Sequence, residues 1–316
     1  GRKRASVANP DPRQRLTGSG HCAALGGQVL VHGWRYRFSL SKFHKMSEGQ
    51  HIPYAASALP VPHARSVLVL APHPDDETIG CGGSAALYAQ AGIPVRALVM
   101  TDGSLWGAPP PGMGVVEARE AETRAAAQVL GCAEPLFARH PDRHLPTGAV
   151  LVAEIVAQVR ASGADTVFAP SLWEVHPDHR VLAEAAIDAL EALGAGYTLV
   201  QYEVGMPLLP NVLVDITPVL ECKHKAMACF VSQLAMQAYD RHVNALNVFR
   251  TYTLPASVLA AEGFRVCTPQ EARDDPYGLM FQGHAHPALA AMRVTGGAMT
   301  FADWCRRGMR LLRRAC

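Results

Sequence analysis

The chain has 316 residues, of which 49% are hydrophobic and 18% charged, and its formal net charge is +2. This composition is typical of a globular protein with one large α/β domain or a domain with an appendage. The small charge argues against the basic face of a nucleic-acid binder, so we predict no nucleic-acid partner. Eight cysteines without a C-x-x-C pair argue against a disulfide framework and predict a cytoplasmic protein.

The first 62 residues are the least regular part of the chain. Residues 1–20 are polar, basic and rich in helix breakers, which is typical of a loosely ordered arm. Residues 28–40 alternate apolar with polar or aromatic side chains, a pattern that fits either an added edge strand or a hairpin. We therefore treat 1–62 as an N-terminal arm that contains one such element.

From Ser66 onward, short apolar runs alternate with alanine-rich stretches, a pattern typical of βαβ units rather than a β-sandwich. Strands are predicted at 66–71, 94–101, 135–138, 166–169, 198–203 and 212–215. Helices are predicted at 82–91, 115–130, 149–161, 179–193 and 219–236. We therefore predict an α/β core over residues 63–254, whose right-handed crossovers bring the carboxyl ends of the strands to one edge.

Polar residues concentrate directly after two of these strands. His73–Glu77 (HPDDE) follows the first strand and places an imidazole and three carboxylates in five residues, which is costly without a cation. His176–His179 (HPDH) follows the fourth strand. A third His-Pro-Asp at 140–142 follows a weaker strand, so we interpret His140 and His144 as surface-loop residues. Because open α/β sheets bind ligands at the carboxyl ends of strands, the first two groups are expected to meet in one site.

These residues have the composition of a metal site. A catalytic zinc ion needs about three protein ligands and an open position for water. His73 and Asp76 are three residues apart at a strand-to-helix turn and can converge on one ion, whereas the adjacent Asp75 points elsewhere. His179 can supply the third ligand. A competing interpretation, helix capping by Asp75 or Asp76, requires only one carboxylate. We predict zinc at His73, Asp76 and His179, while iron or cobalt can occupy similar ligands.

The remaining polar residues can carry out proton transfer. A metal-activated water needs a base, and Asp75 lies beside the predicted ion without binding it. His176 is the candidate for stabilising an oxyanion or protonating an amine, with Asp178 close enough to hold its ring in one tautomer. The predicted catalytic residues are therefore Asp75, His176 and Asp178. This constellation suits hydrolysis of an amide or ester.

Ala71–Glu77 taken together with His176–His179 resembles the PIG-L/LmbE family of zinc-dependent N-acetylglucosaminyl deacetylases, over roughly residues 66–254. The resemblance implies a Rossmann-like fold, in which a mostly parallel sheet carries helices on both faces. It also implies removal of acetyl from an N-acetylglucosamine-type conjugate. In that family pattern the metal ligands fall at the positions of His73, Asp76 and His179. The base falls at the position of Asp75, and the oxyanion or acid histidine at that of His176.

Weaker similarities concern substrate binding. Asp102 lies in a Thr-Asp-Gly after the second strand, Arg119 lies on the following helix, and Asp142 lies in a loop similar to the family's sugar-contacting loop. The resemblance makes all three candidate substrate-binding residues, although Asp142 is explained equally well as a turn residue. Glu174 is a departure, because some relatives carry a tyrosine there that helps the oxyanion. Oxyanion support from that side is left open.

Residues 255–316 are predicted to form a C-terminal extension. Its end, 301–316, can place apolar side chains on one helical face and five arginines on the other. Such a helix either docks on the domain with its arginines in solvent or contacts an anionic membrane surface. Membrane association therefore stays open as an alternative to a purely cytoplasmic location.

The sequence thus predicts an enzyme, a zinc-dependent hydrolase that deacetylates an amino-sugar conjugate. One alternative is a metal amidase that cleaves another amide, such as a thiol conjugate or a larger acyl group. Another is a non-catalytic sugar-conjugate binding module, which would be expected to have lost Asp75 or His176. The segment 239–252 is a candidate for lining the substrate pocket. The sequence does not determine the acceptor, its attachment to a lipid, the oligomeric state or the physiological metal.

Overall fold

A computed structural model describes residues 28–31, 34–37 and 56–277 of the chain. Seven strands form one sheet: β3 (Val67–Ala71), β4 (Val95–Thr101), β5 (Ala133–His140), β6 (Thr166–Pro170), β7 (Thr198–Tyr202), β8 (Val212–Asp215) and β9 (Ala261–Cys267). Their order across the sheet is β5-β4-β3-β6-β7-β9-β8. Neighbours from β5 to β7 are parallel, whereas β9 is antiparallel to β7 and β8. The prediction of a mostly parallel α/β sheet is confirmed.

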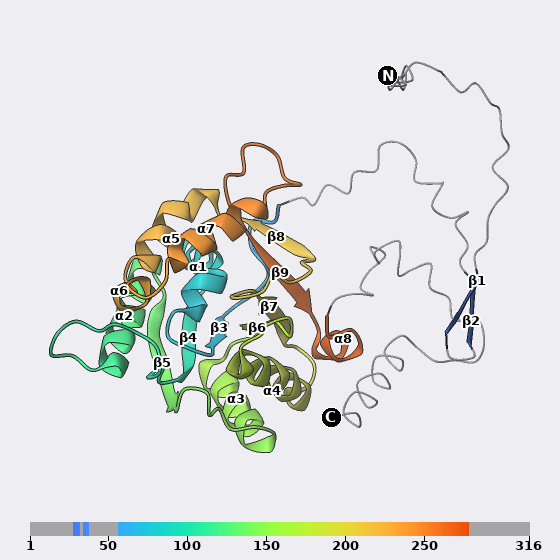
Figure 1. Cartoon of the computed structure of the whole chain (residues 1–316), viewed down its shortest axis with the longest axis horizontal. Helices are drawn as coiled ribbons and strands as arrows, with labels where there is room; N and C mark the ends of the chain where they lie inside the picture. The colour runs from blue at the N-terminus through green and yellow to red at the C-terminus, as the bar shows by residue number, and fades with distance from the viewer. Residues whose placement is uncertain (1–27, 32–33, 38–55, 278–316) are drawn as a thin grey trace, which may run out of the picture.

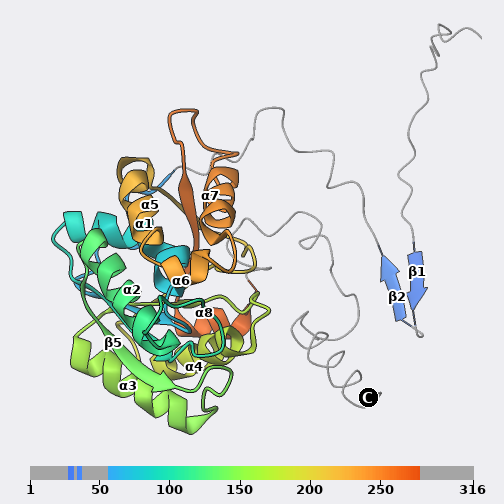
Figure 2. The ribbon, with the colours of Figure 1, turned by 60° about the vertical axis from the view of Figure 1, so that its left-hand side comes forward.

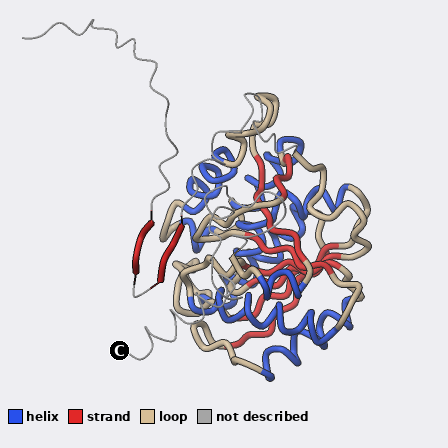
Figure 3. The backbone as a smooth tube through the Cα atoms, turned by 90° about the vertical axis from the view of Figure 1, so that its right-hand side faces the viewer, coloured by secondary structure: helices blue, strands red, loops and turns tan. Residues whose placement is uncertain are grey.

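Helices cover both faces of this sheet, as Figures 1 and 2 show. The helices are α1 (Asp76–Gln90), α2 (Val115–Leu130), α3 (Ala149–Ser162), α4 (Pro177–Leu193), η2 (Thr217–Val219), α5 (Leu220–Met227), α6 (Val231–Leu234), α7 (Tyr239–Phe249) and α8 (Pro269–Asp274). On one face α1, α2 and α5 contact one another, and on the other α4 contacts α3 and α8. In Figure 3 the strands run through the middle of the molecule between these layers. The Rossmann-like layering is therefore confirmed.

The core lies on both sides of the sheet, and β3 explains why. Successive side chains of a strand point to opposite faces. Val67 and Val69 accordingly belong to the apolar cluster beneath α1 and α5, while Leu68 and Leu70 belong to the cluster beneath α3 and α4. All five residues of β3 are buried, as are all five of β6. A strand buried on both faces is usually a nearly continuous apolar run, which is why β3 and β6 are so clear in the sequence.

The order of the strands reverses beside β3. From β3 the chain continues to β4 and β5 on one side, and then returns to β6 and β7 on the other. Loops that leave the carboxyl ends of β3 and β6 therefore diverge onto opposite faces and open a crevice between them. Both histidine-containing motifs lie in these two loops.

The structure also adds detail at the two ends of the described chain. β1 (Gln28–Val31) and β2 (Trp34–Arg37) pair antiparallel as a two-stranded sheet of their own, which fits the hairpin interpretation rather than an added edge strand. Within the predicted C-terminal extension, β9 is hydrogen-bonded into the main sheet. The basic helix predicted at 301–316 lies outside the described residues. No helix in the described part of the chain is long and apolar enough to cross a bilayer.

Candidate metal centre and catalytic pocket

The site begins where β3 turns into α1. That helix starts at Asp76 rather than at the predicted Gly82, and it contains a kink at Cys81, whose φ and ψ are −143° and 17°. Directly after the kink, the backbone N–H groups of Gly83 and Ser84 donate to the buried carboxylate of Glu262 on β9, each at 2.8 Å. The prediction therefore recovered only the part of α1 that follows the kink and missed the turns before it.

Three side-chain atoms from the two motifs converge. His73 Nδ1 lies 3.1 Å from Asp76 Oδ2 and 3.2 Å from His179 Nε2, and the last two atoms are 3.2 Å apart. Ligands placed about 2.0–2.1 Å from a tetrahedral zinc ion are separated by about 3.3–3.4 Å. The donor triangle therefore has nearly the dimensions of one face of a zinc coordination sphere, and all three residues are buried.

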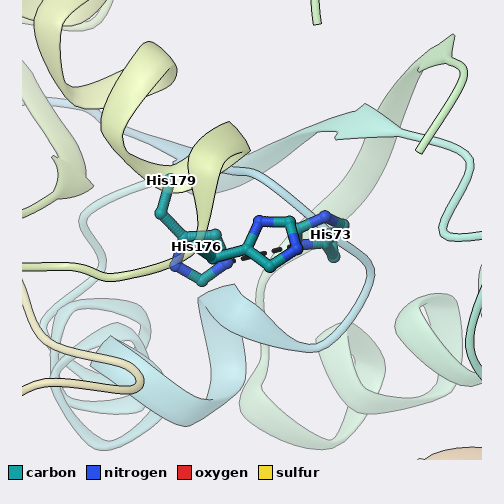
Figure 4. A group of neighbouring side chains, drawn as sticks. All are labelled: His73, His176 and His179. Carbon is teal, nitrogen blue, oxygen red and sulfur yellow. Dashed lines mark hydrogen bonds between the residues drawn. The ribbon is translucent and has the colours of Figure 1, made fainter. Parts of the chain in front are cut away.

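Other groupings of donors overlap with this one. Nitrogens of His73, His176 and His179 lie within 4.8 Å of one another, and so do donor atoms of His73, Asp142, His176 and Asp178. Figure 4 shows the three rings side by side, with His176 and His179 contributed by the start of α4. The triangle with Asp76 has sides of 3.1 to 3.2 Å.

The second nitrogen of His73 also faces carboxylates. Nε2 lies 3.2 Å from Asp178 Oδ2 and 3.4 Å from Asp142 Oδ1. An acceptor on the second nitrogen is the usual partner of a metal-binding histidine, because it fixes the tautomer that leaves the first nitrogen free. Asp178 thus contacts both rings: its carboxylate faces His73, and its backbone N–H donates to His176. Its catalytic role stays a prediction.

His176 precedes α4 and is fixed by the start of that helix. The N–H of Asp178 donates to Nδ1 of His176 at 3.3 Å, so the proton of the neutral ring resides on Nε2. Burial, together with the neighbouring His73 and His179, lowers the pKa of His176. Its ring packs edge-on against that of His73, with 4.6 Å between centroids. A neutral imidazole with a fixed Nε2–H is suited to donate to an oxyanion.

The charges around the triangle favour a cation. Burial opposes the charged form of Asp76, but the facing rings of His179 and His73 outweigh it and hold the pKa of Asp76 well below its usual range. Burial likewise opposes charge on His179, yet Asp76 raises the pKa of His179 to about 9. Burial also opposes charge on His73, but its three neighbouring carboxylates, those of Asp142, Asp178 and Asp76, outweigh burial and raise the pKa of His73. Excess carboxylate in a buried site is neutralised either by protonated imidazoles or by a metal ion.

Asp75 is held apart from the triangle. Its φ of 135° is a strained value for a non-glycine residue, and the carboxylate of Glu77 accepts its backbone N–H at 3.1 Å. Arg119 Nη2 lies 3.3 Å from Asp75 Oδ2. Burial raises the pKa of Asp75 to about 7, although Arg119 opposes that shift. A carboxylate with a pKa near neutrality can both accept and release a proton.

A pocket of about 650 Å³ is lined by the donor triangle, by Asp75 and by His176. Asp142 and Arg119 line it, but the Arg119 guanidinium already donates to the carbonyl oxygens of Pro74 and Gly103. Asp102 is not among the lining residues, and its carboxylate accepts the N–H groups of Ser104 and Asp142. Of the three residues predicted to bind substrate, Asp142 and Arg119 thus reach the pocket and Asp102 shapes a loop.

Further lining residues lie outside the two motifs. Trp106 and Val175 are exposed, whereas Glu174, noted in the sequence only as a departure from the family pattern, is buried. The predicted contribution of segment 239–252 is also seen, because α7 lines one wall with Tyr239, His242, Val243, Leu246 and Asn247. These residues come from loops and a helix outside the two motifs, so spacing within a motif could not identify them.

The chain is similar in sequence and fold to known deacetylases. Residues 68–190 match PIG-L, described as GlcNAc-PI de-N-acetylase. The chain is 29% identical over 199 residues to diacetylchitobiose deacetylase from Thermococcus kodakarensis, covering 57% of this chain and 74% of that protein. It is 30% identical over 208 residues to 2'-N-acetylparomamine deacetylase from Streptomyces fradiae, covering 52% and 72%. The solved N,N'-diacetylchitobiose deacetylase from Pyrococcus horikoshii, complexed with its inhibitor MPG, gives a TM-score of 0.59 at 27% identity, covering 66% and 86%.

Proposed function

Because the chain belongs to the PIG-L family of de-N-acetylases, we propose that it is a zinc-dependent hydrolase acting on the acetamide of an N-acetylglucosamine-type conjugate. The observation that carries this proposal is the donor triangle of His73 Nδ1, Asp76 Oδ2 and His179 Nε2, with sides of 3.1 to 3.2 Å. Two imidazoles and one carboxylate form a ligand set that suits zinc and leaves room for a water molecule.

The same triangle is favoured over the other groupings as the ligand set. Nδ1 of His176 already accepts the N–H of Asp178, and Nε2 of His73 already faces two carboxylates. Within the triangle, Oδ2 of Asp76 also accepts the backbone N–H of His73 at 2.9 Å, which leaves this oxygen a further lone pair for a metal ion, while Nδ1 of His73 and Nε2 of His179 face each other and that oxygen. His73, Asp76 and His179 are therefore the residues that would hold the ion. When bound, zinc supplies Lewis-acid chemistry, because it polarises a carbonyl and favours deprotonation of water.

The other residues carry the proton transfers. Asp75 lines the pocket next to the ligands and takes a proton from the attacking water. The fixed Nε2–H of His176 donates to the amide oxygen as negative charge develops on it. The C–N bond then breaks, and the carboxyl group of Asp75 returns its proton to the departing amine. The products are acetate and the free amino sugar.

The rest of the pocket selects the substrate. Its volume of about 650 Å³ lies in the usual range for sites that bind small molecules. Asp142 lies on the wall that contains the histidines and suits a sugar hydroxyl. Trp106 and Val175 at the mouth offer apolar surface to the ring face or to the acceptor. The structure does not favour a thiol conjugate or a larger acyl group over this class.

A panel assay tests the proposal. The purified protein is loaded with zinc and, separately, with iron or cobalt, and each form is incubated with N-acetylglucosaminyl conjugates that differ in acceptor. Enzymatic measurement of acetate and detection of the free amine report turnover. We expect metal-dependent acetate release from at least one conjugate. Binding of conjugates without release of acetate would instead support a sugar-binding module, and release of a larger acid from other amides would support another amidase.

A further inference from the structure

Glu174 is a buried carboxylate that connects the ends of two strands. Glu174 lies in the loop after β6 and is only 2% exposed. Its carboxylate accepts hydrogen bonds from the backbone that follows β7. The N–H of Val204 donates to Oε1 at 2.8 Å, that of Gly205 to both oxygens at 3.1 and 3.2 Å, and that of Met206 to Oε1 at 3.3 Å. Three consecutive amides thus fix the carboxylate in place.

The same carboxylate faces the back of a predicted metal ligand. Oε2 of Glu174 lies 3.4 Å from Nδ1 of His179, whereas Nε2 of that ring belongs to the donor triangle. The His179 ring is buried, and in the part of the chain that the structure describes its Nδ1 has no partner at hydrogen-bond geometry. A buried ring nitrogen without a partner is costly, and the nearest acceptor is Glu174.

We propose that Glu174 is the positioning residue for His179. Its Oε2 accepts the Nδ1–H of the ring, which fixes the tautomer whose Nε2 lone pair binds the ion. This inference rests on the proposed function. The separation of 3.4 Å is longer than the usual 2.9–3.0 Å of an N–H···O bond, so a slight turn of the ring completes the contact.

His73 supports this assignment because it has the same arrangement. Its Nδ1 lies in the triangle and its Nε2 faces Asp178 and Asp142. Each histidine of the triangle therefore has a carboxylate behind it. Glu174 faces Nδ1 of His179, the ring nitrogen that lies outside the triangle, so this residue acts through His179 and does not bind the ion itself. A carboxylate also has no proton to donate to an oxyanion, so it cannot replace the tyrosine that some relatives carry here.

The substitution Glu174→Gln tests this role. A glutamine has the same shape and retains one oxygen for the N–H of Val204, but its NH₂ group favours the tautomer of His179 with the proton on Nε2. We expect the Kd for zinc, measured by competition with a chromophoric chelator, to rise by about 10–100-fold. The visible spectrum of the cobalt-substituted protein should change as well, because one ligand is displaced or rotated.

Glu203→Gln is a matched control. Glu203 is equally buried and lines the same pocket, but it pairs with Arg250 rather than with a predicted ligand. We expect this variant to lose stability without weakening zinc binding. A zinc Kd for Glu174→Gln within about threefold of the wild-type value would overturn the proposal. Equal weakening in both variants would also overturn it, because the effect would then be a general loss of buried charge.

The wild-type protein offers a test that does not depend on a variant. Long-range ¹H–¹⁵N spectra of histidine-labelled, zinc-loaded protein should show the proton of His179 on Nδ1, and a proton on Nε2 would overturn the proposal. Outcomes for the two proposals are distinguishable. If the wild type binds zinc but releases no acetate, and Glu174→Gln binds zinc about 10–100-fold more weakly, the proposed activity fails and the role of Glu174 stands. If it releases acetate and Glu174→Gln binds zinc normally, only the role of Glu174 fails.

Discussion

Replacing Asp75 by asparagine separates proton transfer from metal binding. An asparagine has nearly the same size and can still accept a hydrogen bond from Arg119, which lies 3.3 Å from the carboxylate. It cannot take a proton from water. General acid–base groups contribute about 10²–10⁴-fold, so we expect kcat to fall by this factor, equivalent to about 3–5 kcal/mol. Zinc content should stay at the wild-type level, because the donor triangle does not include Asp75.

The cost of Asp75→Asn in stability should be limited. Breaking a buried ion pair usually costs about 3–5 kcal/mol, because a charge is left without compensation. Arg119, however, keeps the carbonyl oxygens of Pro74, Gly103 and Trp106 as acceptors, so we expect about 1–3 kcal/mol. Acetate release, zinc analysis and urea unfolding measure the three quantities. A matched control is Asp165→Asn, because Asp165 precedes β6 at the end opposite to the site. The reasoning is refuted if the variant keeps wild-type kcat or loses its zinc.

Three further predictions test the site and its support. His179→Ala should lose zinc and activity together, which metal analysis after gel filtration will show; a variant that retains zinc at the wild-type level would argue against this ligand. Glu262→Gln should lower the free energy of unfolding by about 3–5 kcal/mol, because it leaves Lys223 buried without a counter-charge. Lys223 lies 2.7 Å from the Glu262 carboxylate. A loss below about 1 kcal/mol in denaturant titrations would contradict this reasoning. Gly103→Ala should reduce both stability and kcat, because φ is +60° and a Cβ there would lie 2.5 Å from Arg119; unchanged kinetics would show that Arg119 does not position Asp75.

The central sheet could be predicted because its strands are buried on both faces. The predicted strand at 66–71 corresponds to β3, and that at 166–169 to β6, each within one residue at either end. β9 was not predicted, because Glu262 and Arg265 interrupt its apolar pattern although both are buried. Glu262 is tolerated there only because Lys223 and the kinked α1 provide its partners. Such compensation comes from distant segments and leaves no local pattern.

The helices, like the strands, were predicted most accurately where the local sequence pattern is regular. α2 was predicted with its observed bounds, because its amphipathic pattern is regular and Gly131 ends it in a left-handed conformation at φ 75°. The single helix predicted at 219–236 is instead η2, α5 and α6, separated where the chain turns at Phe230. α7 was not predicted as a helix. Its amphipathic pattern is stronger than that of α2, so the sequence did contain a helical signal, and the segment was instead interpreted only as a possible wall of the pocket, which it also forms.

Within the site, spacing identified which residues meet but not every contact between them. His73, Asp76 and His179 meet because two loops leave neighbouring strands at the point where the strand order reverses. The position of the Asp178 carboxylate could not be read in the same way. Asp178 lies in the first turn of α4, where its N–H is free to donate to His176 while its side chain turns to His73. The direction in which a side chain points at the start of a helix depends on tertiary packing, and the spacing of residues in the sequence does not show that packing.

The separate roles of Asp75 and Asp76 follow from one backbone feature. Adjacent side chains of a helical turn already point in different directions, but two neighbouring carboxylates in a buried site still repel each other. Here Asp75 has a φ of 135° immediately before α1 begins, so its side chain leaves the direction of Asp76 and reaches Arg119. This conformation costs on the order of 1–3 kcal/mol, and it is held by the Glu77 carboxylate on the Asp75 N–H and by Arg119 on the carbonyl of Pro74. Glu77 and Arg119 thus maintain the strain that keeps a base beside the ligands without becoming one of them.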